Sequence, residues 1–286
     1  MSLLASRVHI LGIGGAGMSG IARLLIARGV SVSGSDAKDS RRVQALRPLG
    51  AHIFIGHSAE NLEMASTLPS VVVASTAVSP DNPEILRAHE LGIPVLSRAT
   101  ALAELMMGYQ TISVAGTHGK TTTTSMTTVI LQNAGYDPSF AIGSEINESG
   151  SNAHQGSGDW FVVEADESDG TFLVLPTTIA IVTNVEADHL NYWENYQAIE
   201  NAFVDFAVSA SSSGGCAIIC GDDSGAHVVA QRAKALGASV TTYGVESHND
   251  ARIEFIDSAE IGKKFRIHRG NDISPIIQLK VPGTHN

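Results

Sequence analysis

A glycine-rich stretch that ends in lysine and threonine, residues 114–122, has the composition of a loop that binds nucleotide phosphates. Its glycines let backbone N–H groups turn toward a phosphate, and the helix predicted after it adds partial positive charge. Lys120 can reach the outer phosphates, and the Thr121 hydroxyl can bind Mg2+. Val114 stands where the pattern G-x-x-x-x-G-K-[ST] has its first glycine. We therefore expect a shortened phosphate loop, with an ordinary strand-to-helix turn as the alternative.

Carboxylates and a histidine follow two later apolar runs. Four carboxylates lie within residues 164–169, directly after the run 160–163, and they repel one another unless a cation neutralises them. They indicate a Mg2+ site, with a solvated acidic loop as the alternative. His189 follows another apolar run. Because the carboxyl ends of parallel strands meet at one edge of a sheet, we expect Thr121, Glu164 and His189 to lie together.

A second glycine motif opens the chain. Gly12–Gly17 matches G-x-G-x-x-G between a strand predicted at 8–11 and a helix predicted at 18–28. Asp36 ends the next predicted strand, at about the 20-residue spacing where a Rossmann fold contacts a ribose. Taken alone, this motif predicts a bound diphosphate with NAD or FAD as the default ligand. A tight βα turn without a ligand is the alternative.

These motifs belong to strands that alternate with helices, a pattern typical of α/β proteins with parallel sheets. A buried strand predicted at 71–75 runs into the polar loop 75–80, at the kind of strand end where open α/β sheets bind ligands. We predict a Rossmann-like domain at 1–108, followed by a P-loop-type ATPase α/β domain at 109–286.

Two further segments complete the expected architecture. Alternating polar and apolar residues at 251–256, 264–268 and 276–281 predict a small antiparallel β extension beside the parallel sheet. Residues 140–158 are rich in Gly, Ser and Asn, and we expect them to form a mobile, solvent-facing loop.

Composition excludes several classes of protein. The 286 residues carry a net charge of −11 without a long basic run, which argues against nucleic acid as the main ligand. No apolar run reaches the roughly 20 residues that cross a membrane, and the N-terminus lacks a signal-peptide core. Cys216 and Cys220 fit buried core thiols. We therefore expect a cytoplasmic protein without nucleic-acid or membrane partners. We also expect a monomer or weak homodimer, although composition does not bear on the oligomeric state.

Four motifs in order, spread over nearly the whole chain, resemble the Mur ligase family. They are residues 116–122 (GTHGKTT), 164–169 (EADESD), 183–189 (TNVEADH) and the closing 282–286 (PGTHN). Two motifs of the first predicted domain, at 12–20 (GIGGAGMSG) and 75–83 (STAVSPDNP), are similar to the same family. The resemblance is strongest to the members that join L-alanine to UDP-N-acetylmuramate with ATP and Mg2+ during peptidoglycan precursor synthesis.

The resemblance implies a role for each matching residue. Lys120 would hold the β- and γ-phosphates of ATP, Thr121 and Glu164 would bind one Mg2+, and His189 would bind a second. The ATP site would comprise Gly116, Thr117, His118, Gly119, Lys120, Thr121, Thr122 and the adenine-contacting Asn286. The UDP diphosphate would lie against Gly14, Gly15, Ala16, Gly17, Met18 and Ser19, with nucleoside contacts expected from Asp36, His57, Ser75, Thr76 and Ala77.

The implied reaction explains why these residues occur together. Transfer of the γ-phosphoryl group of ATP would convert a carboxylate into an acyl phosphate, which the amine of alanine attacks. Donor and acceptor are both anions, so Lys120 and metal ions would screen their repulsion. No protein nucleophile is required.

Two features depart from the family pattern. Family members have a third domain that binds the amino acid, and this chain stops where that domain would begin, so we expect little or no ligation by the chain alone. Several relatives use a carbamylated lysine after the histidine motif, whereas no lysine occurs between His189 and Lys234. A carboxylate or water would have to serve there.

Three other functions remain open from the sequence. Within the family, the recycling ligase attaches a whole tripeptide to the same sugar nucleotide. Its motifs usually have Tyr at the position of Ser168 and Phe at that of Ala187, so both positions favour the alanine-adding members. An NAD-dependent oxidoreductase would leave the loop at 116–122 unexplained, and a P-loop hydrolase would leave Gly12–Gly17 unexplained.

Overall fold

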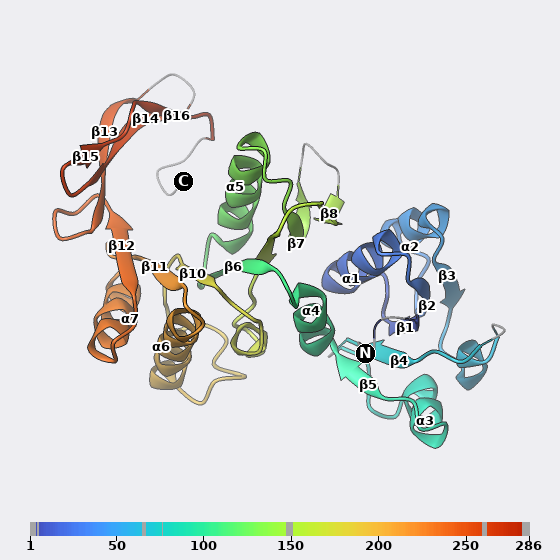
Figure 1. Ribbon diagram of the computed structural model, residues 1–286. Helices are drawn as coiled ribbons and strands as arrows, with labels where there is room; N and C mark the ends of the chain where they lie inside the picture. The colour runs from blue at the N-terminus through green and yellow to red at the C-terminus, as the bar shows by residue number, and fades with distance from the viewer. Residues whose placement is uncertain are drawn as a thin grey trace. The chain divides into compact units, whose positions relative to one another are not determined.

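The computed structural model describes residues 4, 6–64, 67–75, 77–146, 151–258 and 262–281. Contacts between Cα atoms divide the chain into two compact units (Figure 1). The first unit comprises residues 1–110, 125–164 and 174–176, and the second comprises 111–124, 165–173 and 177–286. The domain boundary expected between residues 108 and 109 stays a prediction.

The first unit contains a five-stranded parallel sheet of the Rossmann type. Its strand order is β3-β2-β1-β4-β5. The strands are β1 (Arg7–Leu11), β2 (Ser31–Asp36), β3 (His52–Ile55), β4 (Val71–Ala74) and β5 (Val95–Ser97). The helices are α1 (Ala16–Ala27), α2 (Arg41–Leu46), α3 (Pro83–Glu90) and α4 (Arg98–Met106), with short 3-10 turns η2 (Arg47–Leu49) and η3 (Ala59–Leu62). Since β1 connects to β2 on one side and pairs with β4 on the other, the ends of β1 and β4 mark the switch point where such sheets bind ligands.

A second set of strands in the first unit corrects one expectation. The described residues of 140–158 do not form a solvent-facing loop: β7 (Ser139–Ile146) pairs with β8 (Ser151–His154) and with β9 (Trp160–Glu164). Phe140 and Ile142 are buried, and α1 packs against β7 and β8. The Asn152 side chain donates to the Ala16 carbonyl at 2.6 Å. Burial of a few apolar residues against α1 therefore outweighs the loop-like composition.

The second unit has a mixed sheet. Its parallel part contains β6 (Gln110–Ala115), β10 (Ile179–Val182), β11 (Cys216–Cys220), β12 (Val240–Gly244) and β13 (Ala251–Ser258). The strands β14 (Lys263–Arg269), β15 (Asp272–Ile273) and β16 (Ile277–Leu279) add antiparallel pairs. The predicted α/β architecture with an antiparallel extension is confirmed.

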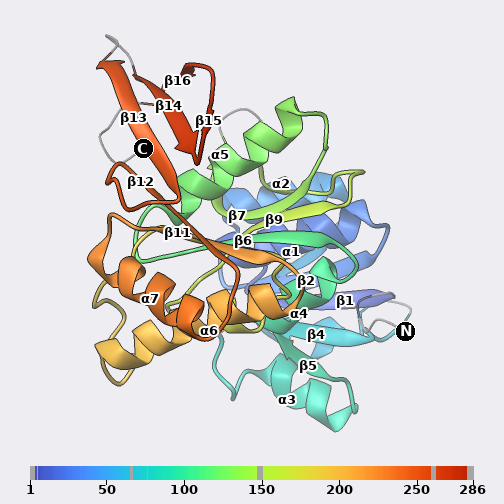
Figure 2. The ribbon, with the colours of Figure 1, turned by 60° about the vertical axis from the view of Figure 1, so that its left-hand side comes forward.

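Helices and an aromatic cluster cover the parallel strands of the second unit. The helices α6 (Tyr196–Ser212) and α7 (Ser224–Ala235) lie side by side against β10, β11 and β12 (Figure 2). Beneath α6, Phe172 of η4 (Thr171–Leu173) packs 5.1 Å from Phe203 and 5.2 Å from Phe206 between ring centroids. Cys216 and Cys220 are half-buried, so the expectation of buried thiols is wrong: the intervening Ala217 and Ile219 face the core instead.

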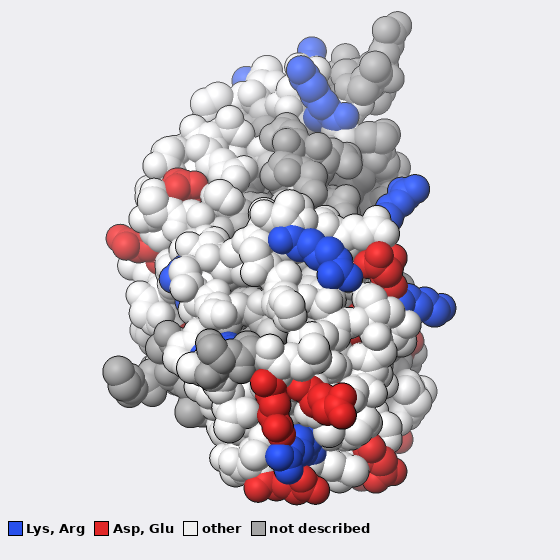
Figure 3. All heavy atoms as spheres, turned by 90° about the vertical axis from the view of Figure 1, so that its right-hand side faces the viewer, with Lys and Arg blue, Asp and Glu red and all other residues white. Residues whose placement is uncertain are grey.

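Charged side chains are dispersed over the surface in view. On the face drawn in Figure 3, uncharged residues separate most of the lysines and arginines, and the described part of that face has no continuous basic patch. Arg87 illustrates local pairing, since it forms ion pairs with Glu63 and Glu90 at 2.6 and 2.9 Å. No helix among the described residues has the length and apolar character needed to cross a membrane.

Candidate functional site

The first candidate site begins at the glycine turn between β1 and α1. Gly12 has a left-handed backbone with φ of +69°, and Gly15 precedes α1 without a side-chain cap on the helix. Backbone N–H groups at an uncapped helix start favour an anion. The side chains of Met18 and Ser19 are buried, so backbone atoms and Gly surfaces remain as the ligand-facing part of this turn.

Asp36 lies at the turn, as its position at the end of β2 predicts. Its Oδ2 atom accepts a hydrogen bond from the Gly14 N–H at 2.9 Å. A Cβ atom on Gly14 would lie 2.8 Å from Val43 and 3.0 Å from Asp36 Oδ2, so a larger residue there would displace neighbouring side chains. Ser75, after β4, lies on the other side, 3.6 Å from where a Cβ of Gly12 would stand. Asp36 and Ser75 thus both border the glycine turn.

Two residues that lie beside predicted site residues have no assignment from the sequence. The Arg98 guanidinium lies 2.9 Å from where a Cβ of Gly17 would stand, which brings a cation to the first turn of α1. Glu84 lies in the first turn of α3 and is fully buried, and its Oε1 atom lies 3.0 Å from His57 Nδ1. Arg98 is the first residue after a serine cap, but only the tertiary fold reveals its neighbour.

The second candidate site is the phosphate loop between β6 and α5 (Lys120–Asn133). Gly116 and Gly119 have φ of +136° and +83°. The segment after β10 holds the loop in place: Asn184 accepts from the N–H groups of Thr117 and His118 at 3.1 and 2.7 Å. The Glu186 N–H donates to the Thr117 hydroxyl at 2.9 Å. A loop fixed by a neighbouring strand end is preorganised for phosphate.

Lys120 is held at the mouth of this loop. Its Nζ atom donates to the Gly116 carbonyl at 2.7 Å and to Glu167 Oε1 at 2.7 Å. Glu167 is 2% exposed, and its Oε2 atom is buried without a hydrogen-bond partner among the described residues. Burial raises the pKa of Glu167 above its usual value, although Lys120 acts in the opposite direction. A buried carboxylate with one unsatisfied oxygen fits a site that receives a further cation.

His189 borders the same carboxylate. Its Nε2 atom lies 3.7 Å from Glu167 Oε1 and 3.8 Å from Asp188 Oδ2. Its φ of +54° is uncommon for a residue other than glycine, and such backbone strain is frequent at functional sites. Trp193 fixes the backbone of Glu167, since its indole N–H donates to the Glu167 carbonyl at 3.0 Å. The second unit thus brings Lys120, Glu167 and His189 together.

The other predicted residues of the ATP and metal sites are distributed as follows. Thr121 and Thr122 lie in the first turn of α5. Glu164 ends β9 in the first unit, where its Oε2 atom accepts from the Gly143 N–H at 2.7 Å. Within the described ranges, no three His, Cys, Asp or Glu side chains form a ready metal site. Mg2+ usually binds one or two carboxylates together with substrate phosphates. The residues present can supply the carboxylates. Thr76 and Asn286 lie outside the described residues.

Asp223 ties this site to the following helix, and replacing it should be costly. Its Oδ1 atom caps α7 by accepting from the Ala226 N–H at 2.8 Å, and it also accepts from the Val185 N–H at 3.0 Å. Losing a helix cap costs about 1 kcal/mol, and a second orphaned N–H costs about 1 kcal/mol more. We expect Asp223→Ala to lower the free energy of unfolding by about 2 kcal/mol, measured by urea titration.

Asn195→Ala is the matched control. Asn195 caps α6 by accepting from the Ala198 N–H at 3.0 Å, but it has no described bond to the segment 183–189. It should lose about 1 kcal/mol and keep nucleotide affinity, whereas Asp223→Ala should also weaken nucleotide binding through the Val185–Glu186 segment. Equal losses in both variants would contradict the role given to the Val185 contact.

Comparisons with known proteins agree with the resemblance. The family model described as the Mur ligase family catalytic domain matches residues 7–110, and the one for the Mur ligase middle domain matches 114–286. UDP-N-acetylmuramate–L-alanine ligases of Saccharopolyspora erythraea and Rhodococcus jostii are both 50% identical, over 100% and 97% of this chain. The chain spans 58% and 56% of their lengths.

Solved structures give the same fold for two ligase activities. The UDP-N-acetylmuramate-alanine ligase of Thermotoga maritima matches with a TM-score of 0.82 and 28% identity, over 98% of this chain and 61% of that one. A ligase from Neisseria meningitides that joins UDP-N-acetylmuramate to L-alanyl-gamma-D-glutamyl-meso-diaminopimelate matches with a TM-score of 0.85 and 26% identity, over 98% and 89%. Fold similarity alone therefore does not separate the two substrates.

Proposed function

Since the chain belongs to the Mur ligase family, we propose that it supplies the sugar-nucleotide-binding and ATP-binding parts of a ligase that joins L-alanine to UDP-N-acetylmuramate. The observation that carries this proposal is the 50% identity, over the whole chain, to ligases of that name. The enzyme would work in the cytoplasm in peptidoglycan precursor synthesis.

The residues of the second unit fit the ATP half of this reaction. Lys120 would exchange the Gly116 carbonyl for the outer phosphates of ATP, because a charged phosphate oxygen is a stronger partner than a neutral carbonyl. Thr121, Glu164 and His189 would hold Mg2+, which when bound offsets the charge that develops during phosphoryl transfer. The N–H groups of the loop 116–122, apart from those of Thr117 and His118 that donate to Asn184, would orient the triphosphate.

The residues of the first unit fit the sugar-nucleotide half. The turn Gly14–Ser19 would hold the diphosphate at the start of α1, and Asp36, His57 and the loop at Ser75 would contact the nucleoside. The tripeptide-adding ligase remains the nearest alternative, because its structures match equally well. Ser168 and Ala187 favour the alanine-adding activity.

Calorimetric titration with UDP-N-acetylmuramate tests the proposal on the 286-residue chain. We expect one binding event per chain, and no comparable binding of NAD. Tight NAD binding without sugar-nucleotide binding would instead support an oxidoreductase. Fast ATP hydrolysis that is indifferent to UDP-N-acetylmuramate would support a P-loop hydrolase.

A further inference from the structure

A buried carboxylate in the first unit has contacts to four separate parts of the fold. Glu84 Oε2 lies 2.6 Å from His9 Nε2 and accepts from the Ser35 hydroxyl at 3.0 Å. Its Oε1 atom lies 3.0 Å from His57 Nδ1 and accepts from the Asn61 amide at 3.2 Å. These partners come from β1, β2, the segment after β3, and η3. Both carboxylate oxygens are thus fully used, although the side chain is 0% exposed.

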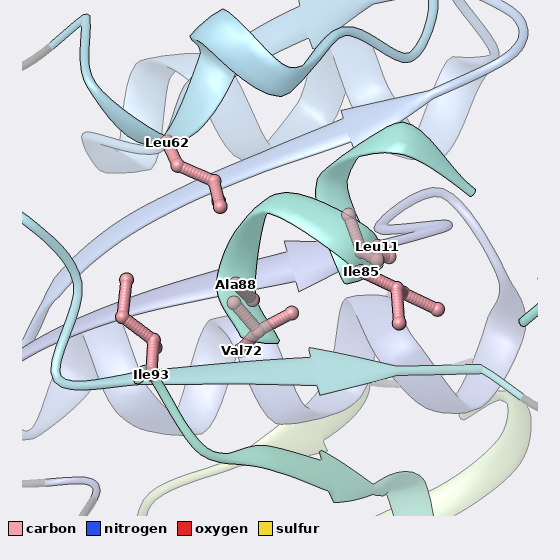
Figure 4. Close-up of a cluster of buried hydrophobic side chains, with 6 residues drawn as sticks. All are labelled: Leu11, Leu62, Val72, Ile85, Ala88 and Ile93. Atoms are coloured by element: carbon pink, nitrogen blue, oxygen red, sulfur yellow. The ribbon is translucent and has the colours of Figure 1, made fainter. Parts of the chain in front are cut away.

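The surroundings of Glu84 are otherwise apolar. The next residue, Ile85, belongs to a buried cluster with Leu11, Leu62, Val72, Ala88 and Ile93, and Figure 4 shows Leu11 beside Ile85. Burial by itself raises the pKa of Glu84, but hydrogen bonds and charge from His9, with hydrogen bonds from Ser35 and His57, outweigh it and hold the pKa below its usual value. The ionised form is therefore the native one. A charge buried this way gives little net stability compared with apolar packing, so its placement calls for another reason.

The partners of Glu84 differ in their exposure. His9 is completely buried, whereas the His57 side chain is 27% exposed. The Ser35 hydroxyl lies 3.0 Å from both His57 Nδ1 and Glu84 Oε2, and the next residue, Asp36, accepts from the Gly14 N–H. Glu84 is therefore linked to the glycine turn through the end of β2, where Ser35 contacts Glu84 and the adjacent Asp36 accepts from Gly14. Among the partners of Glu84, His57 is the residue whose Nδ1 atom is held by a hydrogen bond while part of its ring is exposed to solvent.

We propose that Glu84 is a positioning residue for nucleoside recognition: it fixes His57 through Nδ1 so that Nε2 faces the nucleoside of a bound UDP-sugar. This inference deepens the proposed function and rests on it. A carboxylate accepts only, so neutral His57 must carry its proton on Nδ1 and leave Nε2 as an acceptor. Nε2 has no hydrogen-bond partner within the described part of the chain. An imide N–H of uracil or a ribose hydroxyl is the kind of donor that such a nitrogen accepts.

The first test reads the histidine directly. Two-bond proton–nitrogen NMR spectra of the wild-type chain should show His57 as the Nδ1–H tautomer without any ligand. The conservative variant Glu84→Gln keeps the shape, but it offers an amide in place of an acceptor-only group, so the Nε2–H form of His57 should appear. A wild-type His57 that is predominantly Nε2–H would overturn the proposal, even if Glu84→Gln failed to fold.

The second test measures binding of UDP-N-acetylmuramate by calorimetry. Glu84→Gln should weaken affinity about tenfold, equivalent to 1.4 kcal/mol, and His57→Ala by at least as much. In the His57→Ala background, Glu84→Gln should cause no further loss, because its effect acts through His57. Additive losses in the double variant would show a merely structural role and overturn the proposal.

Ser33→Ala is the matched control. The Ser33 hydroxyl lies 2.9 Å from His9 Nδ1 and accepts from Arg7 at 3.1 Å, so it belongs to the same buried network but does not touch His57. It should lower thermal stability and leave both the tautomer and the affinity unchanged; a tenfold affinity loss in Ser33→Ala would contradict the specific role of Glu84. If the wild-type chain does not bind UDP-N-acetylmuramate, the proposed function fails, while the tautomer spectrum still tests the hold of Glu84 on His57.

Discussion

Lys120→Met should strongly weaken ATP binding and destabilise the second unit at the same time. Lys120 is the cation that the loop 116–122 offers to the outer phosphates, and removing one partner of a close charge pair costs about 2–5 kcal/mol of binding. We therefore expect an affinity loss of roughly thirtyfold or more. Titration with a fluorescent ATP analogue, with the wild-type chain as reference, measures it.

The loss of stability has a separate cause. Without Lys120, the buried Glu167 carboxylate loses the amine that lies 2.7 Å from its Oε1 atom, and its Oε2 atom has no described partner to compensate. Breaking a buried ion pair by removing one member costs about 3–5 kcal/mol. The Lys120 side chain keeps 15% exposure, so we expect the lower end, about 3 kcal/mol, measured by urea unfolding.

The double variant Lys120→Met with Glu167→Gln separates the two effects. The glutamine at position 167 is neutral and does not need a cation beside it, so most of the lost free energy of unfolding should return. ATP binding should not return, because the phosphates still lack Lys120. If the double variant stays as unstable as Lys120→Met, an unpaired carboxylate is not the cause, and lost packing of the lysine stem would have to explain the result.

The sequence predicts the strands and turns of both units well for a physical reason. Buried parallel strands favour continuous apolar runs, as in β1 and β4, and the turns after β1 and β6 require glycine, as the left-handed φ of Gly12 and Gly116 demonstrates. These signals are local, so they survive without tertiary context. The β7–β8 pair lacks such signals. Phe140 and Ile142 lie in a segment of mostly small residues, and their burial depends on tertiary neighbours of β7, among them α1, more than 100 residues earlier.

The candidate sites are harder to predict from the sequence, because their contacts join segments that are far apart along the chain. The acidic motif at 164–169 indicates a bound cation, but the sequence alone does not show which of its carboxylates lies beside Lys120. Sequence analysis assigns the leading role to Glu164, while the carboxylate beside Lys120 is that of Glu167. The roles of Glu164 and His189 in metal binding stay predictions. Glu84 carries no motif at all: its importance follows from four partners that lie 23 to 75 residues away.

Gly116→Ala should disable the phosphate loop more severely than any other single methyl group added to it. Gly116 has φ of +136°, a conformation that costs an L-residue about 1–3 kcal/mol. The added Cβ would also stand 2.1 Å from Thr183 Oγ1 and 3.0 Å from the N and O atoms of Asn184. Overpacking of this kind costs about 1–3 kcal/mol more. We expect about 4 kcal/mol of lost stability from these two terms, and loss of ATP binding, because the displaced residues hold Thr117 and His118.

Gly135→Ala distinguishes strain from collision. Gly135 follows α5 with φ of +83°, and an added Cβ there would meet no heavy atom within 4 Å. That variant should lose only the cost of strain, about 1–2 kcal/mol, and keep ATP binding. Adding Thr183→Ala to Gly116→Ala removes the nearest obstacle but leaves Asn184 in place, so it should restore only part of the stability. A Gly116→Ala variant that behaves like Gly135→Ala in both assays would mean that the segment after β10 yields to the loop rather than fixing it.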